Sequence, residues 1–212
     1  MTTTHSPSHS ADGVFTVHGL TDEKIDAITD VCSALRASEK GRAIEILADR
    51  FPFDPQPITA RKYGPVESTR VFIRDGFVDR FSGDRLIFPP VFRLISLQLP
   101  EEFPYHPNWK TDETHPAYDA LGCTVDHLQP VTQGGADDES NWVTTSMAHN
   151  FAKMNYSLDQ LGWTLYPPGD FREWDGLLHW FMEFNKLYPE SLDVSNLRHW
   201  HRAAESGLAE VS

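Results

Sequence analysis

The sequence has few cysteines and no long apolar run, and each absence excludes a class of protein. Cys32 and Cys123 are its two cysteines among 212 residues, so it can form neither a disulfide framework nor a four-cysteine zinc site. We expect both to be small, buried apolar groups. No stretch approaches the roughly 18 apolar residues of a membrane span, and the opening MTTTHSPSHSADG does not resemble a signal peptide. These absences predict a soluble, cytoplasmic protein without a membrane partner.

Basic residues are scarce as well. The chain has 18 Lys and Arg against 31 Asp and Glu, a formal net charge of −13. This balance argues against a protein that coats nucleic acid, because phosphate contacts need cations. Residues 61–93, however, hold seven basic and four acidic residues, a local charge of +3. The stretch is therefore either a chance cluster on a solvated face or one basic groove on an acidic body.

Large apolar side chains are abundant. Hydrophobic residues make up 40% of the chain and aromatic residues 12%, enough to bury a sizeable core, which excludes global disorder. Apolar alternation predicts one strand over 123–131 and a returning strand over 141–145, joined by a turn at Gly134-Gly135. Helical spacing predicts helices over 21–35, 41–51, 65–75, 90–98, 146–155, 170–188 and 193–205.

These elements suggest four regions. Residues 1–13 are polar and Ser/Thr-rich, which is typical of a disordered tail, and residues 14–60 form an N-terminal helical region. Residues 61–155 hold both strands and include an insertion at 84–122 rich in proline and aromatic residues. Residues 156–212 form a C-terminal helical region. We therefore expect an α+β fold that is mostly helical.

The most informative stretch is TVDHLQPVTQGGADDESNWVTTSMAHNFAKMN, residues 124–155. It combines an Asp-His pair on a strand, a Gly-Gly turn, an Asn fourteen residues after the His, and a helix with His, Asn and Lys. This pattern resembles the HNH endonuclease family, whose strand–loop–strand–helix unit, the ββα-metal fold, binds one divalent cation. The residues in register are Asp126, His127, Pro130, Gly134, Gly135, Asp138, Asn141, Asn150 and Lys153.

A second block supports the resemblance. VFIRDGFVDRFSG, residues 71–83, is similar to the segment that precedes the motif in many family members. The four cysteines that usually hold a structural zinc are replaced by Asp79, Ser82, Ser146 and His149. Because thiolates supply most of the affinity of such sites, we expect no structural zinc here. Packing of the 84–122 insertion and the aromatic helices would then supply the stability.

The resemblance also implies roles for single residues. Asp126 would ligate the metal, with Asn150 as the second ligand and His149 as its competitor if the helix register differs. His127 would take a proton from water, which suits a side chain that titrates near pH 6.5. Asn141 would hold the loop that follows His127. One carboxylate and one amide leave most coordination positions open, which favours Mg²⁺ or Mn²⁺.

Basic side chains complete the predicted site. Lys153, one turn beyond Asn150, would contact a phosphate, and Arg70 and Arg85 are further candidates for substrate contact. Arg74 fits a structural ion pair equally well. The resulting hypothesis is a metal-dependent endonuclease that cleaves DNA. Two alternatives stay open: an interaction module that keeps the fold without the activity, or a metal hydrolase with another substrate. A protein partner would be compatible with each, and the sequence leaves the oligomeric state open.

Overall fold

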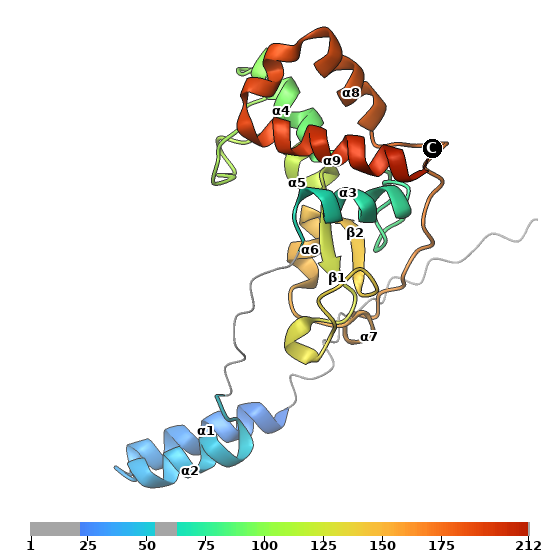
Figure 1. The fold of residues 1–212 in the computed structure, drawn as a ribbon. Coiled ribbons are helices and arrows are strands. Elements are labelled where there is room, and N and C mark those ends of the chain that lie inside the picture. Colours follow the sequence, from blue (N-terminus) through green and yellow to red (C-terminus); the bar gives the residue numbers. More distant parts are fainter. Residues whose placement is uncertain (1–21, 54–62, 212) are drawn as a thin grey trace, which may run out of the picture. The chain divides into compact units, whose positions relative to one another are not determined.

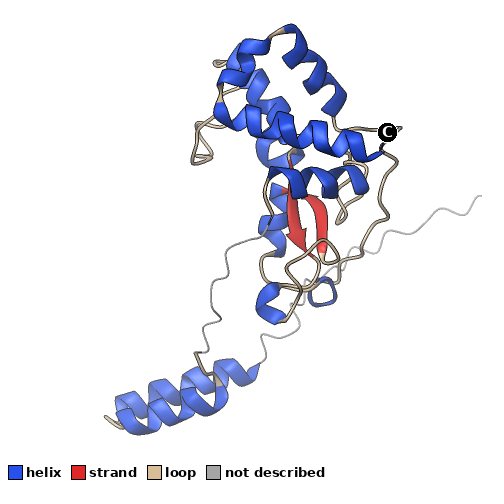
Figure 2. Cartoon of the chain, in the orientation of Figure 1, coloured by secondary structure: helices blue, strands red, loops and turns tan. Residues whose placement is uncertain are grey.

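The computed structural model describes residues 22–53 and 63–211 (Figures 1 and 2). The tail expected over 1–13 lies outside these residues. The chain divides into two compact units, one of residues 1–56 with 159–162 and one of residues 57–158 with 163–212. The short helix α7 (Leu158–Leu161) falls almost wholly in the first. The described residues contain no helix long and apolar enough to cross a membrane.

The first unit is a hairpin of two antiparallel helices, α1 (Asp22–Arg36) and α2 (Lys40–Arg50). Val31, Ala34 and Ala43 are buried between the helices, with Ile46 packed against them. Cys32 is exposed, so the expectation that both cysteines are buried was wrong for this one. It follows Val31, which faces α2, and is thereby turned away from the partner helix.

The second unit holds one small sheet. Strands β1 (Cys123–His127) and β2 (Trp142–Ser146) pair antiparallel, with Asp126 opposite Val143 and His127 opposite Trp142. The 3₁₀ turn Val131–Gln133 lies in the connecting loop, and helix α6 (Met147–Lys153) follows β2 directly. The predicted order of strand, loop, strand and helix is thus present, in a helix-rich α+β fold.

The other helices of the second unit lie toward the upper end of this sheet in Figure 1. They are α3 (Pro65–Arg74), α4 (Pro89–Gln98), α5 (Ala117–Leu121), α8 (Leu178–Leu187) and α9 (Ser195–Val211), with a 3₁₀ segment at Pro189–Asp193. The α3 and α9 helices lie side by side (Figure 1). Leu197 and Ala204 of α9 share one core cluster with Phe72, Val125 and Trp142. The C-terminal helices therefore complete the hydrophobic core around the sheet and are not a separate layer.

Several elements differ from the sequence prediction: α9 extends to Val211 instead of 205, β1 ends at His127 instead of 131, and α7 was not predicted. Two further helices differ in the second unit. The helix expected over 170–188 begins only at Leu178, because Gly176 (φ +62°) and Leu177 (φ +65°) adopt left-handed backbone angles that interrupt a helix. Asp175 accepts hydrogen bonds from the backbone N–H groups of Leu177 and His179 and so starts the helix there. Within the 84–122 insertion, where one helix was expected, α5 forms a second, short one.

Candidate active site

The loop between the strands is held in place by Asn141. Its Oδ1 accepts a hydrogen bond from Gln129 N at 2.9 Å, and its Nδ2 donates to the carbonyls of Gln129 and Ala136, both at 2.8 Å. Gly135 must be a glycine, because a Cβ there would lie 2.0 Å from the carbonyl oxygen of Gln129. Asn141 thus binds both ends of the loop that follows His127.

His127 stands at the end of β1 with its ring largely enclosed. Its Nε2 lies 2.9 Å from Oδ1 of Asp137 and 3.0 Å from Nε1 of Trp142, while that indole nitrogen lies 3.3 Å from the same carboxylate oxygen. Because a carboxylate only accepts hydrogen bonds, the consistent arrangement is Nε2–H and indole N–H both donating to Asp137. Among the described residues no hydrogen bond to Nδ1 of His127 is found.

Asp137, the carboxylate that contacts His127, was not among the residues expected from the sequence. The motif assigns the neighbouring Asp138, whose Oδ1 instead accepts from the backbone and hydroxyl of Ser140 within the turn. Two adjacent carboxylates in a loop give no sequence signal for which of them faces the strand. Asp137 lies ten residues after His127 in the sequence, so the two side chains meet only because the loop folds back on β1.

Asp126 is buried, and its carboxylate faces the buried ammonium of Lys153. Its Oδ1 accepts from His127 N at 2.8 Å, whereas its buried Oδ2 has no hydrogen-bond partner. Nζ of Lys153 lies 3.1 Å from this Oδ2 and donates to the His127 carbonyl at 2.7 Å. The Lys153 side chain is only 1% exposed. In this arrangement the ammonium is not free to contact a phosphate, which differs from the role expected for it.

Asn150 lies on the same face of α6 as Lys153, one turn earlier. Its Nδ2 donates to the carbonyl of Val125 at 3.3 Å, a long hydrogen bond that places the side chain against β1. The start of α6 is fixed by Ser146, whose side chain caps the helix by accepting from His149 N. Asn150 therefore lies against the strand that carries Asp126 and His127, through the Val125 carbonyl.

His149 belongs to a different cluster, which it forms with Asp79 and Ser146 at three of the four positions where the family that the sequence resembles has cysteines. Asp79 lies at its centre and is 1% exposed. Its carboxylate accepts from the backbone N–H groups of Phe81 and Ser146 and from the Thr145 hydroxyl, and it lies 2.8 Å from Nδ1 of His149. His149 thus points toward Asp79, whereas Asn150 and Lys153 are the α6 side chains beside β1.

The hydrogen bonds to Asp79 also set its charge state. Burial pushes the pKa of this carboxyl upward, but the hydrogen bonds from His149, Phe81 and Ser146 outweigh it and hold the pKa below its usual range. Asp79 is therefore a carboxylate at neutral pH, and its negative charge ties together α6, β2 and the turn after residue 79. Nearby Cys123 is fully buried, which raises the pKa of its thiol well above the usual range.

The described arginines of residues 61–93 already contact other side chains of the protein. Arg70 pairs with Glu210 of α9 at 2.9 Å, and Arg74 pairs with the buried Asp75 and donates to the Glu139 and Trp142 carbonyls. The exposed Arg85 lies over the Trp174 ring. Arg80 also pairs with Asp75. Arg61 and Lys62 lie outside the described residues.

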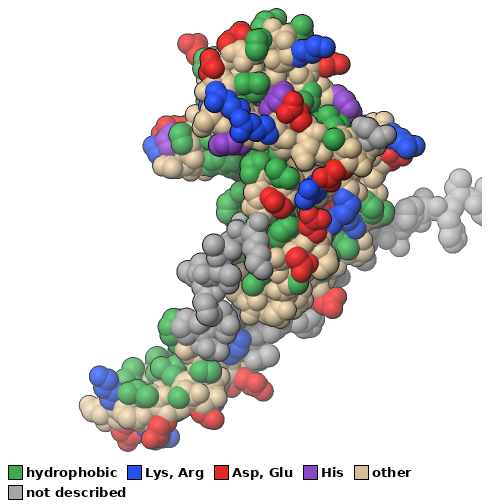
Figure 3. Space-filling view, viewed as in Figure 1, with side chains coloured by type: hydrophobic (Ala, Val, Ile, Leu, Met, Phe, Trp, Pro, Cys, Tyr) green, Lys and Arg blue, Asp and Glu red, His purple; other side chains and the backbone are tan. Residues whose placement is uncertain are grey.

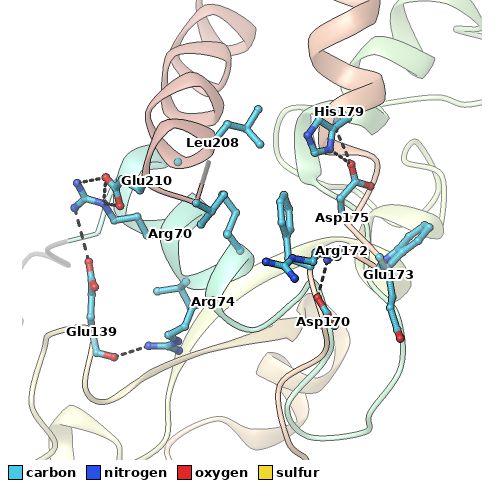
Figure 4. A pocket seen from close by; sticks show the side chains of 16 residues that line it. Arg70, Arg74, Glu139, Asp170, Arg172, Glu173, Asp175, His179, Leu208 and Glu210 are labelled. Carbon is cyan, nitrogen blue, oxygen red and sulfur yellow. Dashed lines mark hydrogen bonds and ion pairs between the residues drawn. The ribbon is translucent and has the colours of Figure 1, made fainter.

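A cavity of about 820 Å³ is lined by Arg70 and Arg74, but not by Arg85 (Figure 4). Its walls also carry five carboxylates, from Glu139, Asp170, Glu173, Asp175 and Glu210. The described basic residues therefore do not form one continuous positive groove. Arg74, whose Nη1 donates to the Glu139 carbonyl at 2.8 Å, connects this cavity to the loop that carries Asp137.

The donor set of the site fits a hard divalent cation in its chemistry. A buried carboxylate oxygen without a hydrogen-bond donor, on Asp126, lies at the strand against which the amide of Asn150 packs, and oxygen donors of this type suit Mg²⁺ or Mn²⁺. Within the described residues no group of three His, Cys, Asp or Glu side chains is placed to hold a metal ion. Any cation at Asp126 would also meet the ammonium of Lys153.

No model of a known protein family, no curated protein and no solved structure matches this chain.

Proposed function

We propose that this protein is a metal-dependent, HNH-type endonuclease that hydrolyses phosphodiester bonds of DNA. The observation that carries the proposal is the ring of His127, held by Asp137 and following directly on the buried carboxylate of Asp126, whose Oδ2 has, among the described residues, only the Lys153 ammonium beside it. A histidine oriented by a carboxylate is the usual arrangement of a general base. The resemblance of residues 124–155 to the family motif supports the same conclusion.

In this proposal each side chain has a defined task. Asp137 accepts the Nε2 proton of His127 and fixes the tautomer, so that the lone pair of Nδ1 takes a proton from the attacking water. Asn141 keeps the loop in the conformation that brings Asp137 to the ring. Asp126 and Asn150 would hold the cation, which when bound supplies charge neutralisation at the phosphoryl and leaving oxygens.

The direct test is cleavage of supercoiled plasmid with Mg²⁺ or Mn²⁺. We expect nicked and then linear DNA from the native chain and no product from His127→Ala, because the base is lost while the metal ligands remain. The matched control is His179→Ala, which changes an exposed histidine on α8 that pairs with Asp175 and contacts the Phe171 ring. Equal cleavage by native protein and His127→Ala would refute the assignment of His127.

The same assay separates a nuclease from a hydrolase of other phosphodiesters. An RNA of equal length and bis(p-nitrophenyl) phosphate are offered in parallel with the plasmid. Hydrolysis of the small diester without cleavage of either nucleic acid would favour a non-DNA substrate. The abundance of carboxylates around the engaged arginines is compatible with that outcome, since phosphate contacts on a nucleic acid need accessible cations.

A second candidate function is an interaction module that keeps the fold without catalysis. The buried ion pair of Lys153 with Asp126 favours it, because an ammonium already neutralises the carboxylate proposed to bind metal. Titration with Mn²⁺ by calorimetry discriminates the two. Binding that is lost in Asp126→Asn supports the nuclease, whereas the absence of binding, together with intact folding, supports the interaction module.

A further inference from the structure

The α1–α2 hairpin carries a second apolar face in addition to the one between its helices. Two rows of exposed side chains form it, and we call them together the seam: Ile25, Ile28, Cys32 and Leu35 on α1, and Ile44, Leu47 and Phe51 on α2 and its C-cap. Ile25 is 65% exposed, Ile44 58% and Leu35 53%. Figure 3 shows hydrophobic side chains gathered over this hairpin.

The two rows lie on the same side of the hairpin. Cys32, Leu35 and Ile44 each directly follow a residue that is buried between the helices, namely Val31, Ala34 and Ala43. One step along a helix is a rotation of about 100°. Because the helices run antiparallel, these rotations have opposite senses when viewed from one end, and both rows turn toward the same side. The seam is therefore one continuous surface.

The spacing of the seam indicates what covers it. Residues 25, 28, 32 and 35 alternate steps of three and four, as do 44, 47 and 51. This is the spacing by which helices pack side by side in coiled coils and bundles. Binding to a flat protein surface or to a small ligand would not require this alternating spacing. The pattern therefore fits a partner that presents two helices of its own.

We propose that the seam binds the seam of a second copy of this chain, forming an antiparallel four-helix bundle. A second copy offers an apolar surface of the same length and spacing. Residues 23–36 carry a net charge of −1 and residues 40–50 of +1, so a two-fold arrangement that sets α1 against the partner's α2 brings opposite charges together.

The area of the seam fits a weak dimer. A fully exposed aliphatic side chain carries on the order of 100 Å² of apolar surface, so the seam offers roughly 300 Å² on each copy. Doubling this value and adding the polar third that is typical of homodimer interfaces gives about 900 Å² in total, the size of a weak interface rather than of a tight one. The described part of the hairpin, by contrast, buries only Ala27, Val31, Ala34 and Ala43, none of them larger than valine. This inference does not depend on the proposed function.

The test uses the full chain and measures its mass by sedimentation equilibrium at about 1 to 100 μM, a range suited to micromolar dissociation constants. We expect twice the mass of one chain for the native protein. The double substitution Ile25→Ser with Ile44→Ser changes four partly exposed side chains per dimer and should raise the dissociation constant on the order of 100-fold or more. Leu187→Ser, at a 73% exposed position on α8, is the matched control and should remain dimeric.

A second measurement uses Cys32, an exposed thiol within the seam, while Cys123 is buried. In the dimer, maleimide should label Cys32 several-fold more slowly than in the double variant, whose helical content is checked by circular dichroism. A native monomer with a fast-reacting Cys32 overturns the proposal. A native monomer with a protected Cys32 also overturns it and identifies this chain's own second unit as the cover. A dimer that survives the double substitution overturns the seam as its interface.

Discussion

The ammonium of Lys153 lies 3.1 Å from Oδ2 of Asp126, and both side chains are buried. The carboxylate oxygen that would ligate a divalent cation is thus already next to a positive charge supplied by the chain itself. A like-charged ion entering this site would be repelled by the ammonium unless Lys153 moves away. Under the proposed function, Lys153 and the metal ion would therefore compete for Asp126.

The first prediction concerns this competition. Lys153→Met should lower the free energy of unfolding by about 3–5 kcal/mol, because it leaves the Asp126 carboxylate buried without a counter-charge. Added Mn²⁺ should restore part of this stability and raise the melting temperature more than in the native protein. Urea and thermal denaturation with and without Mn²⁺ measure both effects.

Lys186→Met, at an exposed position of α8, is the control for the loss of one positive charge and should change stability by less than about 0.5 kcal/mol. If Lys153→Met is destabilised but Mn²⁺ does not raise its stability, the prediction that Lys153 and the metal ion use the same carboxylate is contradicted. Such a result would leave the ion pair as a purely structural feature of the second unit.

The second prediction concerns the orientation of His127. Asp137→Ala removes the acceptor of the Nε2 proton, so we expect the turnover number for DNA cleavage to fall about 10- to 100-fold. Binding of Mn²⁺ and KM should change little, since Asp126 and Asn150 are untouched. Glu139→Gln, in the same loop, keeps the backbone carbonyl that Arg74 uses and should cleave at the native rate. Equal turnover by the two variants would remove Asp137 from the site.

The third prediction follows from the pKa of Asp79. This pKa lies below its ordinary value of 3.8 in the folded protein, so the carboxylate stabilises the fold above pH 3.8, and this contribution is lost as the pH falls through the lower folded value. Asp79→Asn should cost about 2–4 kcal/mol at pH 7 and should flatten the loss of stability below about pH 4.

Urea denaturation at a series of pH values tests this dependence. Asp84→Asn, at an exposed position in the same turn, is the control and should keep the native pH profile. An Asp79→Asn variant whose stability still declines as steeply as that of the native protein would assign the acid sensitivity to other carboxylates.

The fourth prediction compares two substitutions of Asn141. Asn141→Ala deletes three backbone hydrogen bonds and should cost about 2–3 kcal/mol. Asn141→Asp keeps the acceptor for Gln129 N but turns an anionic oxygen toward the Gln129 and Ala136 carbonyls, so it should be at least as destabilising. Thermal unfolding and limited proteolysis of residues 128–136 provide the measurements. A stable Asn141→Asp variant would show that the donor half of the amide contributes little.

Local sequence signals predicted the strand–loop–strand–helix order well. The alternation in β1 and the Gly134-Gly135 pair mark a hairpin without any knowledge of its surroundings, and Ser146 marks the start of the helix. The long helix expected at 170–188 was shortened by Gly176, where a Cβ would approach the Phe77 ring to 2.1 Å. That contact joins segments 99 positions apart, which no local pattern can reveal.

The helix face and strand on which the expected residues lie were predictable, but their contacts were not. The spacing of Asn150 and Lys153 places both on one helical face, as found. This spacing does not tell whether that helical face is buried against β1 or open to a substrate. Lys153 contacts Asp126 because the face is buried. In the same way the local charge of residues 61–93 says nothing of partners such as Glu210, which lies 140 positions after Arg70.

The cluster around Asp79 has a consequence for the conditions under which this fold survives. A structural zinc site built on cysteine thiolates is lost when an oxidant attacks the sulfur or a chelator removes the metal. At the corresponding positions this chain has a carboxylate, two hydroxyls and an imidazole, none of which undergoes thiol oxidation. The described hydrogen bonds among them hold helix α6 on the sheet without any sulfur. The unit should therefore tolerate peroxide and metal starvation, and acid is the stress to which it responds.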